Sequence, residues 1–139
     1  MLLDCGFSVQ ESTRRLQRLG VEPESLAAIV VTHEHSDHLG GVARVARRYG
    51  LPVWMTRGTH AVWNDVDVPC IEHFDPHTPF AIGDLEMSPY PVPHDAREPA
   101  QFVVGNGGTL LRRSIAALRR GARQTCGFFA RLRRGTPPG

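Results

Sequence analysis

The sequence predicts an α/β layered fold, in which strands and helices alternate along the chain. Apolar runs rich in β-branched residues, above all residues 26–32, are typical of strands buried on both faces. Segments with apolar residues at helical spacing lie between these runs, and a glycine closes each of them. A chain of 139 residues has room for one ordinary domain of ~100–200 residues.

The predicted elements follow one another through short connections. A strand ends at Asp4, and a helix follows over residues 9–19, with Leu16 and Leu19 facing inward and Gly20 ending it. The order continues with a strand at 26–32, a helix at 39–49, and strands at 51–56, 68–74 and 85–92. An Ile-Gly-Asp turn within residues 80–85 indicates a hairpin. Pro89 and Pro91 favour an edge position for the last strand.

Composition excludes several classes of protein. The hydrophobic fraction of 41% and the charged fraction of 22% are those of a soluble globular domain. The longest apolar run, residues 26–31, is far shorter than the ~20 residues that cross a bilayer. The opening residues show no basic segment followed by an apolar one, so we expect a cytoplasmic protein. Three scattered cysteines argue against a disulfide framework, and we expect Cys5 to pack rather than to attack a substrate.

The charge of the chain divides it into two parts. All 16 basic residues are arginines; residues 1–98 hold eight of them and all 14 acids, a net −6, whereas residues 99–139 hold eight arginines and no acid. One interpretation of this Arg- and Gly-rich tail is a frameshift near residues 105–109. The other is a basic amphipathic helix over residues 109–120 that lies on nucleic acid or a membrane surface.

The segment His33-Glu34-His35-Ser36-Asp37-His38 carries the chemistry. It directly follows a buried strand, and open α/β sheets keep their sites at the carboxyl ends of strands. His33 and His35 project to the same side of an extended chain, and Asp37 and His38 follow a bend. Three imidazoles in one loop would be costly to desolvate unless an ion compensated them. The cluster therefore predicts a metal site, while a lone histidine would more often be structural.

The spacing His-x-His-x-Asp-His resembles the signature of the metallo-beta-lactamase superfamily. Further segments resemble its YycJ/WalJ branch, whose members are regarded as phosphodiesterases or DNA exonucleases; these segments are residues 2–8, 32–38, 50–53 and 92–99. The resemblance implies an αβ/βα sandwich, of which this chain would form mainly the N-terminal half. It divides the chain into a partial metallo-beta-lactamase-like domain at 1–104 and an atypical tail at 105–139.

The resemblance also implies roles for individual residues. His33, His35 and His94 would hold a first metal ion, and Asp37 and His38 a second, with Zn²⁺ expected and Mn²⁺ or Fe²⁺ as alternatives. Asp37 would also orient the attacking water, which makes it the candidate catalytic residue. These roles require the ring of His94 to lie near those of His33 and His35.

The sequence leaves the roles of five further residues open. Asp4 resembles the family's acid that braces the metal loop, which is residues 33–38 in this sequence. A plain turn or helix cap is the alternative role of Asp4. For Asp95 we favour a turn former over a contact to the metal ligands. His60, His73 and His77 have no partner at ligand spacing, so we expect them to be solvated or at most to face a substrate.

The chain departs from the family pattern in its second half. That half normally supplies an Asp that bridges the metals and a last His, but this sequence has no His, Asp or Glu from position 99 onward. Half of a sandwich would also expose a sheet face, through which a homodimer could form.

The expected function is metal-dependent hydrolysis of a phosphodiester, with nucleic acid as the substrate. Two alternatives remain: a truncated, inactive metal-binding pseudoenzyme or basic nucleic-acid-binding module, and a thioester or lactam hydrolase on the same fold.

Overall fold

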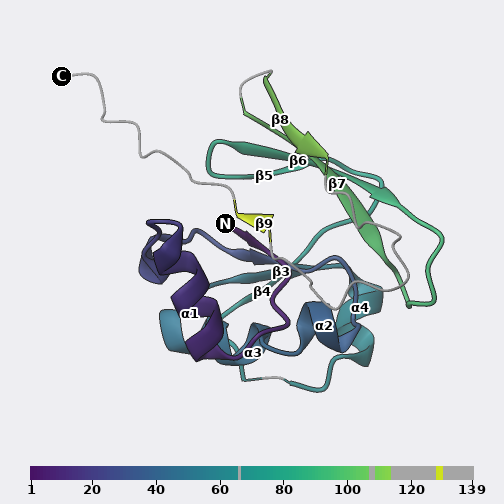
Figure 1. Ribbon diagram of the computed structural model, residues 1–139. Coiled ribbons are helices and arrows are strands. Elements are labelled where there is room, and N and C mark those ends of the chain that lie inside the picture. Colours follow the sequence, from purple (N-terminus) through teal and green to yellow (C-terminus); the bar gives the residue numbers. More distant parts are fainter. Residues whose placement is uncertain (66, 107–108, 114–127, 130–139) are drawn as a thin grey trace.

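The computed structural model describes residues 1–65, 67–106, 109–113 and 128–129. They form two sheets and four α-helices (Figure 1). The first sheet has the order β4-β3-β2-β1-β9, with β1 (Leu2–Leu3), β2 (Ile29–Val30), β3 (Val53–Met55) and β4 (Ile71–His73) parallel and β9 (Phe128–Phe129) antiparallel to β1. The second sheet is antiparallel, with the order β5 (Phe80–Ile82), β6 (Leu85–Pro91), β7 (Ala100–Asn106) and β8 (Thr109–Arg113).

The helices and the second sheet lie on opposite sides of the first sheet (Figure 1). On the helix side are α1 (Val9–Arg18), a 3₁₀ turn (Pro23–Ser25), α2 (Ser36–Leu39), α3 (Val42–Tyr49) and α4 (Arg57–Val62). Successive strand residues point to opposite faces. Ile29 therefore packs in the core beneath the helices, and Val30 packs in the core that the second sheet covers. The predicted α/β fold is confirmed.

The first helix is one residue shorter than predicted, and Leu19 does not face the core. Its side chain is 67% exposed, because Leu19 N–H bonds to Leu16 O and Gly20 N–H to Gln17 O as the last turn tightens. Gly20 then takes a φ of +69°. Val21 occupies the buried place instead, directly after the helix-ending glycine.

The predicted helix over residues 39–49 is two helices, α2 and α3, separated by Gly40 and Gly41. The break lets the turn after β1 approach: Gly41 N–H donates to Cys5 O at 2.8 Å, and a Cβ at position 41 would lie 1.9 Å from Phe7 O. The two glycines serve close backbone packing behind the candidate metal loop.

Strand β6 is not an edge strand, because it pairs with both β5 and β7. The prolines nevertheless lie where only one neighbour is present. Strand β5 pairs with Leu85 to Met87, whereas Pro89 and Pro91 face β7 alone, opposite Phe102 and Ala100. A proline that cannot donate to a ladder is tolerated beside such an open side.

The sheet face that we expected to be exposed is covered. Side chains of β6 and β7, among them Met87, Phe102 and Val104, pack against Leu3 and Val30 of the first sheet. Among residues 1–65 and 67–106 the large exposed hydrophobic residues are Leu19 and Val62. The apolar face that motivated the homodimer is therefore used inside the molecule.

The tail adopts a strand where a helix was one of the two interpretations. Thr109–Arg113 form β8, which pairs with β7. The rest of the predicted helix, residues 114–120, lies outside the described residues. Among the described residues no helix is long and apolar enough to span a membrane.

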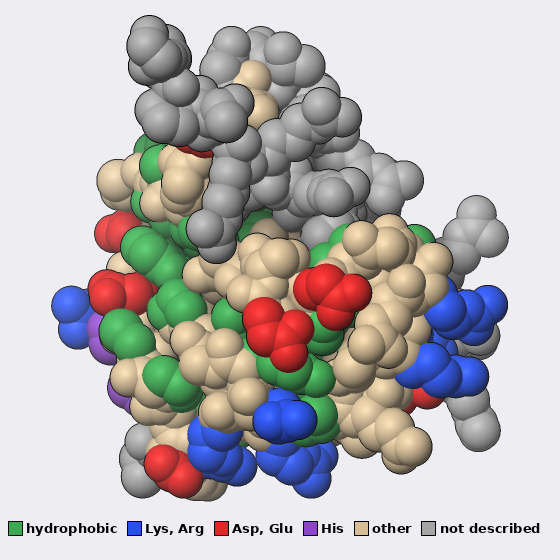
Figure 2. Space-filling view, turned by 90° about the vertical axis from the view of Figure 1, so that its left-hand side faces the viewer, with side chains coloured by type: hydrophobic (Ala, Val, Ile, Leu, Met, Phe, Trp, Pro, Cys, Tyr) green, Lys and Arg blue, Asp and Glu red, His purple; other side chains and the backbone are tan. Residues whose placement is uncertain are grey.

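Charged side chains of both signs are interspersed on the face shown in Figure 2. Arginine side chains lie at the left, lower and right-hand edges of this view, and acidic side chains lie at its centre, left and lower left. This face does not present a track of one sign.

Replacing Gly6 by alanine tests the close packing behind the metal loop. A Cβ there would lie 2.1 Å from the backbone oxygen of Asp37, so neither backbone can yield easily. We expect Gly6→Ala to lower the free energy of unfolding by more than about 2 kcal/mol in urea denaturation.

Gly20→Ala is the matched control, because open space surrounds that position and only its positive φ opposes a side chain. Its cost should be about 1 kcal/mol. An equal or smaller loss for Gly6→Ala would contradict the packing argument.

Candidate metal centre

Three histidines from two separate loops converge at the carboxyl edge of the first sheet. His33 and His35 follow β2, and His94 lies between β6 and β7. The Nε2 atoms of His33 and His94 are 3.1 Å apart. The ring centroid of His94 lies 4.5 Å from that of His33 and 4.7 Å from that of His35. The predicted convergence of the three rings is confirmed.

This arrangement fits a small divalent ion. One nitrogen from each of the three rings lies within 4.8 Å of the others. Nitrogens bound tetrahedrally to Zn²⁺ at about 2.0–2.1 Å lie roughly 3.3 Å from one another, close to the His33–His94 separation. Imidazole nitrogens suit zinc and its neighbouring transition metals. The donor set can therefore hold such an ion after a small closing movement.

His33 is poised as a neutral ligand. Burial, together with the neighbouring imidazoles of His38, His94 and His35, lowers the pKa of His33 to about 3. A histidine must be deprotonated to bind a metal. At neutral pH His33 can therefore bind a metal ion without first releasing a proton.

Asp37 and His38 form a pair beside the three-histidine group. The ring centroids of His38 and His33 are 4.0 Å apart, and His38 Nε2 lies 3.6 Å from Asp37 Oδ2. The Asp37 side chain is 61% exposed. The pair is placed where it could offer one nitrogen and one carboxylate to a second ion, next to the first.

The carboxylate of Asp4 accepts three hydrogen bonds from the metal loop and the residue before it. Its Oδ1 accepts from Thr32 N–H at 2.7 Å, and its Oδ2 accepts from the Thr32 hydroxyl and from His38 Nδ1, both at 2.8 Å. Asp4 has a φ of +58°, a conformation that Asp and Asn tolerate better than most residues. Helix α1 is capped by Ser8 instead. The brace, rather than a helix cap, describes what the Asp4 side chain contacts.

The same contacts set which nitrogen each ring offers. The Thr32 hydroxyl donates its one proton to Asp4, so at 2.9 Å it accepts from His33 Nδ1–H. That leaves the lone pair of His33 on Nε2, facing His94. His38 likewise donates from Nδ1, and its Nε2 lies on the side of Asp37. Hydrogen bonds of this kind orient histidine ligands.

The electrostatics of His38 follow from the same pairing. Burial works against its charged form, but the hydrogen bond to Asp4 and the charges of Asp4 and Asp37 outweigh burial and raise the pKa of His38.

Asp95 contacts two of the three histidines in addition to lying in a bend. Its carbonyl oxygen is 3.0 Å from His35 Nε2, and its Oδ1 is 3.0 Å from His94 Nδ1. The interpretation of Asp95 as a turn former was therefore incomplete.

Three other predictions concern residues outside the cluster. Cys5 is buried, with Sγ 3.3 Å from Ser12 Oγ, and burial raises the pKa of its thiol, so it packs as predicted. His60 and His73 do have a partner, since His60 Nδ1 lies 2.8 Å from His73 Nε2. Helix α4 and strand β4 bring them together, which their separation along the chain does not indicate. His77 lies in a turn, where its N–H donates to Asp75.

Thr32 is the residue that sequence analysis missed. It links Asp4 to His33, and the signal that could have found it is a single hydroxyl at the end of an otherwise apolar strand.

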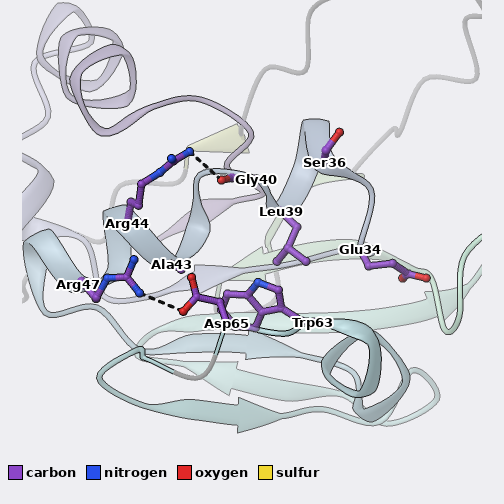
Figure 3. A pocket seen from close by; sticks show the side chains of 9 residues that line it. All are labelled: Glu34, Ser36, Leu39, Gly40, Ala43, Arg44, Arg47, Trp63 and Asp65. Carbon is purple, nitrogen blue, oxygen red and sulfur yellow. Dashed lines mark hydrogen bonds and ion pairs between the residues drawn. The ribbon is translucent and has the colours of Figure 1, made fainter.

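A cavity of about 330 Å³ lies beside the metal loop (Figure 3). Glu34 and Ser36 line it, but none of the three histidines does. Both of its arginines have partners: Arg47 pairs with Asp65, and Arg44 donates to Gly40 O. The cavity is separate from the candidate metal centre.

Comparison with known proteins identifies the family. The sequence pattern of the metallo-beta-lactamase superfamily matches residues 1–114. The chain belongs to this superfamily. Among curated relatives, Exodeoxyribonuclease WalJ of Streptococcus pneumoniae is 33% identical over 105 residues, covering 71% of this chain and 39% of WalJ. Exodeoxyribonuclease YycJ of Bacillus anthracis is 31% identical over 121 residues, covering 80% of this chain and 44% of YycJ.

Solved structures show the same superfamily fold. The subclass B3 metallo-beta-lactamase MEM-A1, from a soil metagenome library, superimposes with a TM-score of 0.62 at 18% identity. The match covers 73% of this chain and 46% of MEM-A1. The chain thus spans less than half the length of these three superfamily members. All three converging histidines lie within residues 1–114, which match the superfamily pattern.

Replacing Asp4 by asparagine tests the brace. Asn tolerates the positive φ but replaces one acceptor oxygen by a donor, so one of the three hydrogen bonds is lost. We expect Asp4→Asn to weaken Zn²⁺ binding about 10- to 100-fold in a competitive chelator titration.

Asp84→Asn provides the control, because Asp84 lies exposed in the turn between β5 and β6. Wild-type affinity in Asp4→Asn would show that the carboxylate does not orient the metal ligands.

Proposed function

We propose that this metallo-beta-lactamase superfamily member is a metal-dependent phosphodiesterase acting on DNA. The observation that carries the proposal is the convergence of His33, His35 and His94. The substrate class is supported by WalJ and YycJ, two exodeoxyribonucleases that match most of this chain, although the chain spans only 39% and 44% of their lengths.

The residues divide the work of hydrolysis among them. The three imidazoles bind the ion, which when bound supplies Lewis-acid chemistry and lowers the pKa of water towards ~7. Zn²⁺ is the proposed ion, with Mn²⁺ or Fe²⁺ as alternatives. Asp37, exposed at the rim, orients the attacking water and with His38 offers a second ion site. Asp4 and Thr32 hold the rings of His33 and His38 in place.

A second candidate function is metal binding without turnover. Residues 99–139 hold no His, Asp or Glu, so within this sequence Asp37 and His38 are the residues proposed for a second ion. A pseudoenzyme or a nucleic-acid-binding module would then retain only the three-histidine ion. The solved metallo-beta-lactamases, at 18% identity, support the fold and not a lactam substrate.

Hydrolysis by the metal-loaded chain tests the choice directly. We expect release of nucleotides from end-labelled DNA and cleavage of bis-p-nitrophenyl phosphate, with no comparable turnover of a β-lactam or a thioester. His35→Ala should lower phosphodiester hydrolysis by about 100-fold or more, because even outer partners of metal ligands cost 10- to 100-fold.

His77→Ala is the matched control, since His77 lies in a turn outside the histidine cluster. Two equivalents of metal per chain would accompany the proposed activity. At most one weakly bound equivalent and no turnover would reject it in favour of the second candidate.

A further inference from the structure

His94 is carried by a segment that has no regular structure of its own. Residues 92–99 connect β6 to β7 without a helix or strand. No backbone ladder therefore sets the position of the third imidazole within this segment. Tertiary contacts must do so, and two glutamates supply them, one from the metal loop and one from the segment itself.

The first of these glutamates is Glu34, which stands between His33 and His35 in the metal loop. Side chains alternate along an extended chain, so Glu34 points away from the side to which the two histidines project. Its Oε1 accepts from the backbone N–H of Arg97 at 2.6 Å. A carboxylate of the metal loop thus holds the backbone of the segment that carries His94.

The second carboxylate oxygen of Glu34, Oε2, has no hydrogen-bond partner in the described part of the chain. Oε2 is buried, and no group among the residues that the structure describes donates a hydrogen bond to it. An unpaired buried acceptor destabilises the folded state. Hydrogen bonds to a charged acceptor are the stronger kind, so the bond to Arg97 offsets part of that cost.

The second glutamate is Glu98, which holds the segment from its other end. Its Oε2 accepts from Gly58 N–H at 2.7 Å, and its carbonyl oxygen accepts from the Thr56 hydroxyl at 3.0 Å. A Cβ at Gly58 would lie 2.4 Å from Glu98 Cβ, so the approach requires a glycine. The segment is thereby fixed to the start of α4.

A third connection closes the arrangement. Ala100 N–H donates to Thr32 O at 3.0 Å, which joins the beginning of β7 to the segment that follows β2. The segment is therefore tied to the metal loop by Glu34, to α4 by Glu98 and to β2 directly after it ends. None of these contacts involves a metal ligand side chain.

We propose that Glu34 and Glu98 are positioning residues that fix the His94 segment against the first sheet, so that the three imidazoles are held close together before the ion arrives. The inference rests on metal binding at the site given under the proposed function and adds what determines its affinity. Neither glutamate contacts the ion or the substrate. Each acts by accepting a backbone hydrogen bond.

Metal titration of the full chain tests this directly. Zn²⁺ affinity is measured by chelator competition, and Co²⁺ absorption reports the coordination of the ion. We expect Glu34→Ala and Glu98→Ala each to weaken binding about 10-fold, the order found for outer partners of metal ligands. Their Co²⁺ bands should also lose intensity at saturation, because His94 no longer stays in the coordination sphere.

Conservative variants separate positioning from a general loss of stability. Glu34→Gln and Glu98→Gln keep an oxygen that can accept the same N–H, so affinity and spectrum should return towards wild type. Glu34→Asp keeps the charge but not the reach, so it should behave as Glu34→Ala. Glu24→Ala, at an exposed position of the 3₁₀ turn, is the control.

Wild-type affinity and spectrum in both alanine variants would overturn the proposal. So would equal losses in the glutamine and alanine variants, because the acceptor would then be irrelevant. If an alanine variant does not fold, the Gln and Asp variants of Glu34 decide. Weakened metal binding in a chain without phosphodiesterase activity would leave this inference intact and reject only the proposed function.

Discussion

Three hydrogen bonds to the carboxylate of Asp4 hold the candidate site together. They connect the residue after β1 to the segment after β2 through Thr32, and to α2 through His38. The cost is a left-handed backbone at a residue that is not glycine, and such strain persists only where the surroundings over-determine it. From this one carboxylate follow the tautomers of His33 and His38, and with them the direction in which each ring offers its lone pair.

Much of the fold was accessible from sequence because its signals are local. Buried strands such as β2 appear as apolar, β-branched runs, and the metal loop follows one of them directly. The failures are tertiary. Leu19 has the right spacing for the core but lies beyond the last helical turn, and Gly41 interrupts a helix because the backbone of Phe7 approaches it.

The site divides in the same way. The spacing from His33 to His38 indicated a metal loop, and the position of His94 came from a resemblance to the family. What sequence could not supply is the direction of each ring, because it depends on Thr32 and on the φ of Asp4. The sequence did not indicate the pairing of His60 with His73 for a similar reason. The contact depends on how α4 and β4 are placed relative to each other in the folded chain.

The two ion positions differ in how complete they are in this chain. The first uses three imidazoles, all within residues 1–114, which match the superfamily pattern. The second has only Asp37 and His38. X-ray absorption at the zinc edge of the chain loaded with one equivalent tests the central claim most directly. The account predicts three imidazole nitrogens at about 2.0–2.1 Å. A coordination sphere with fewer than three imidazoles would contradict it.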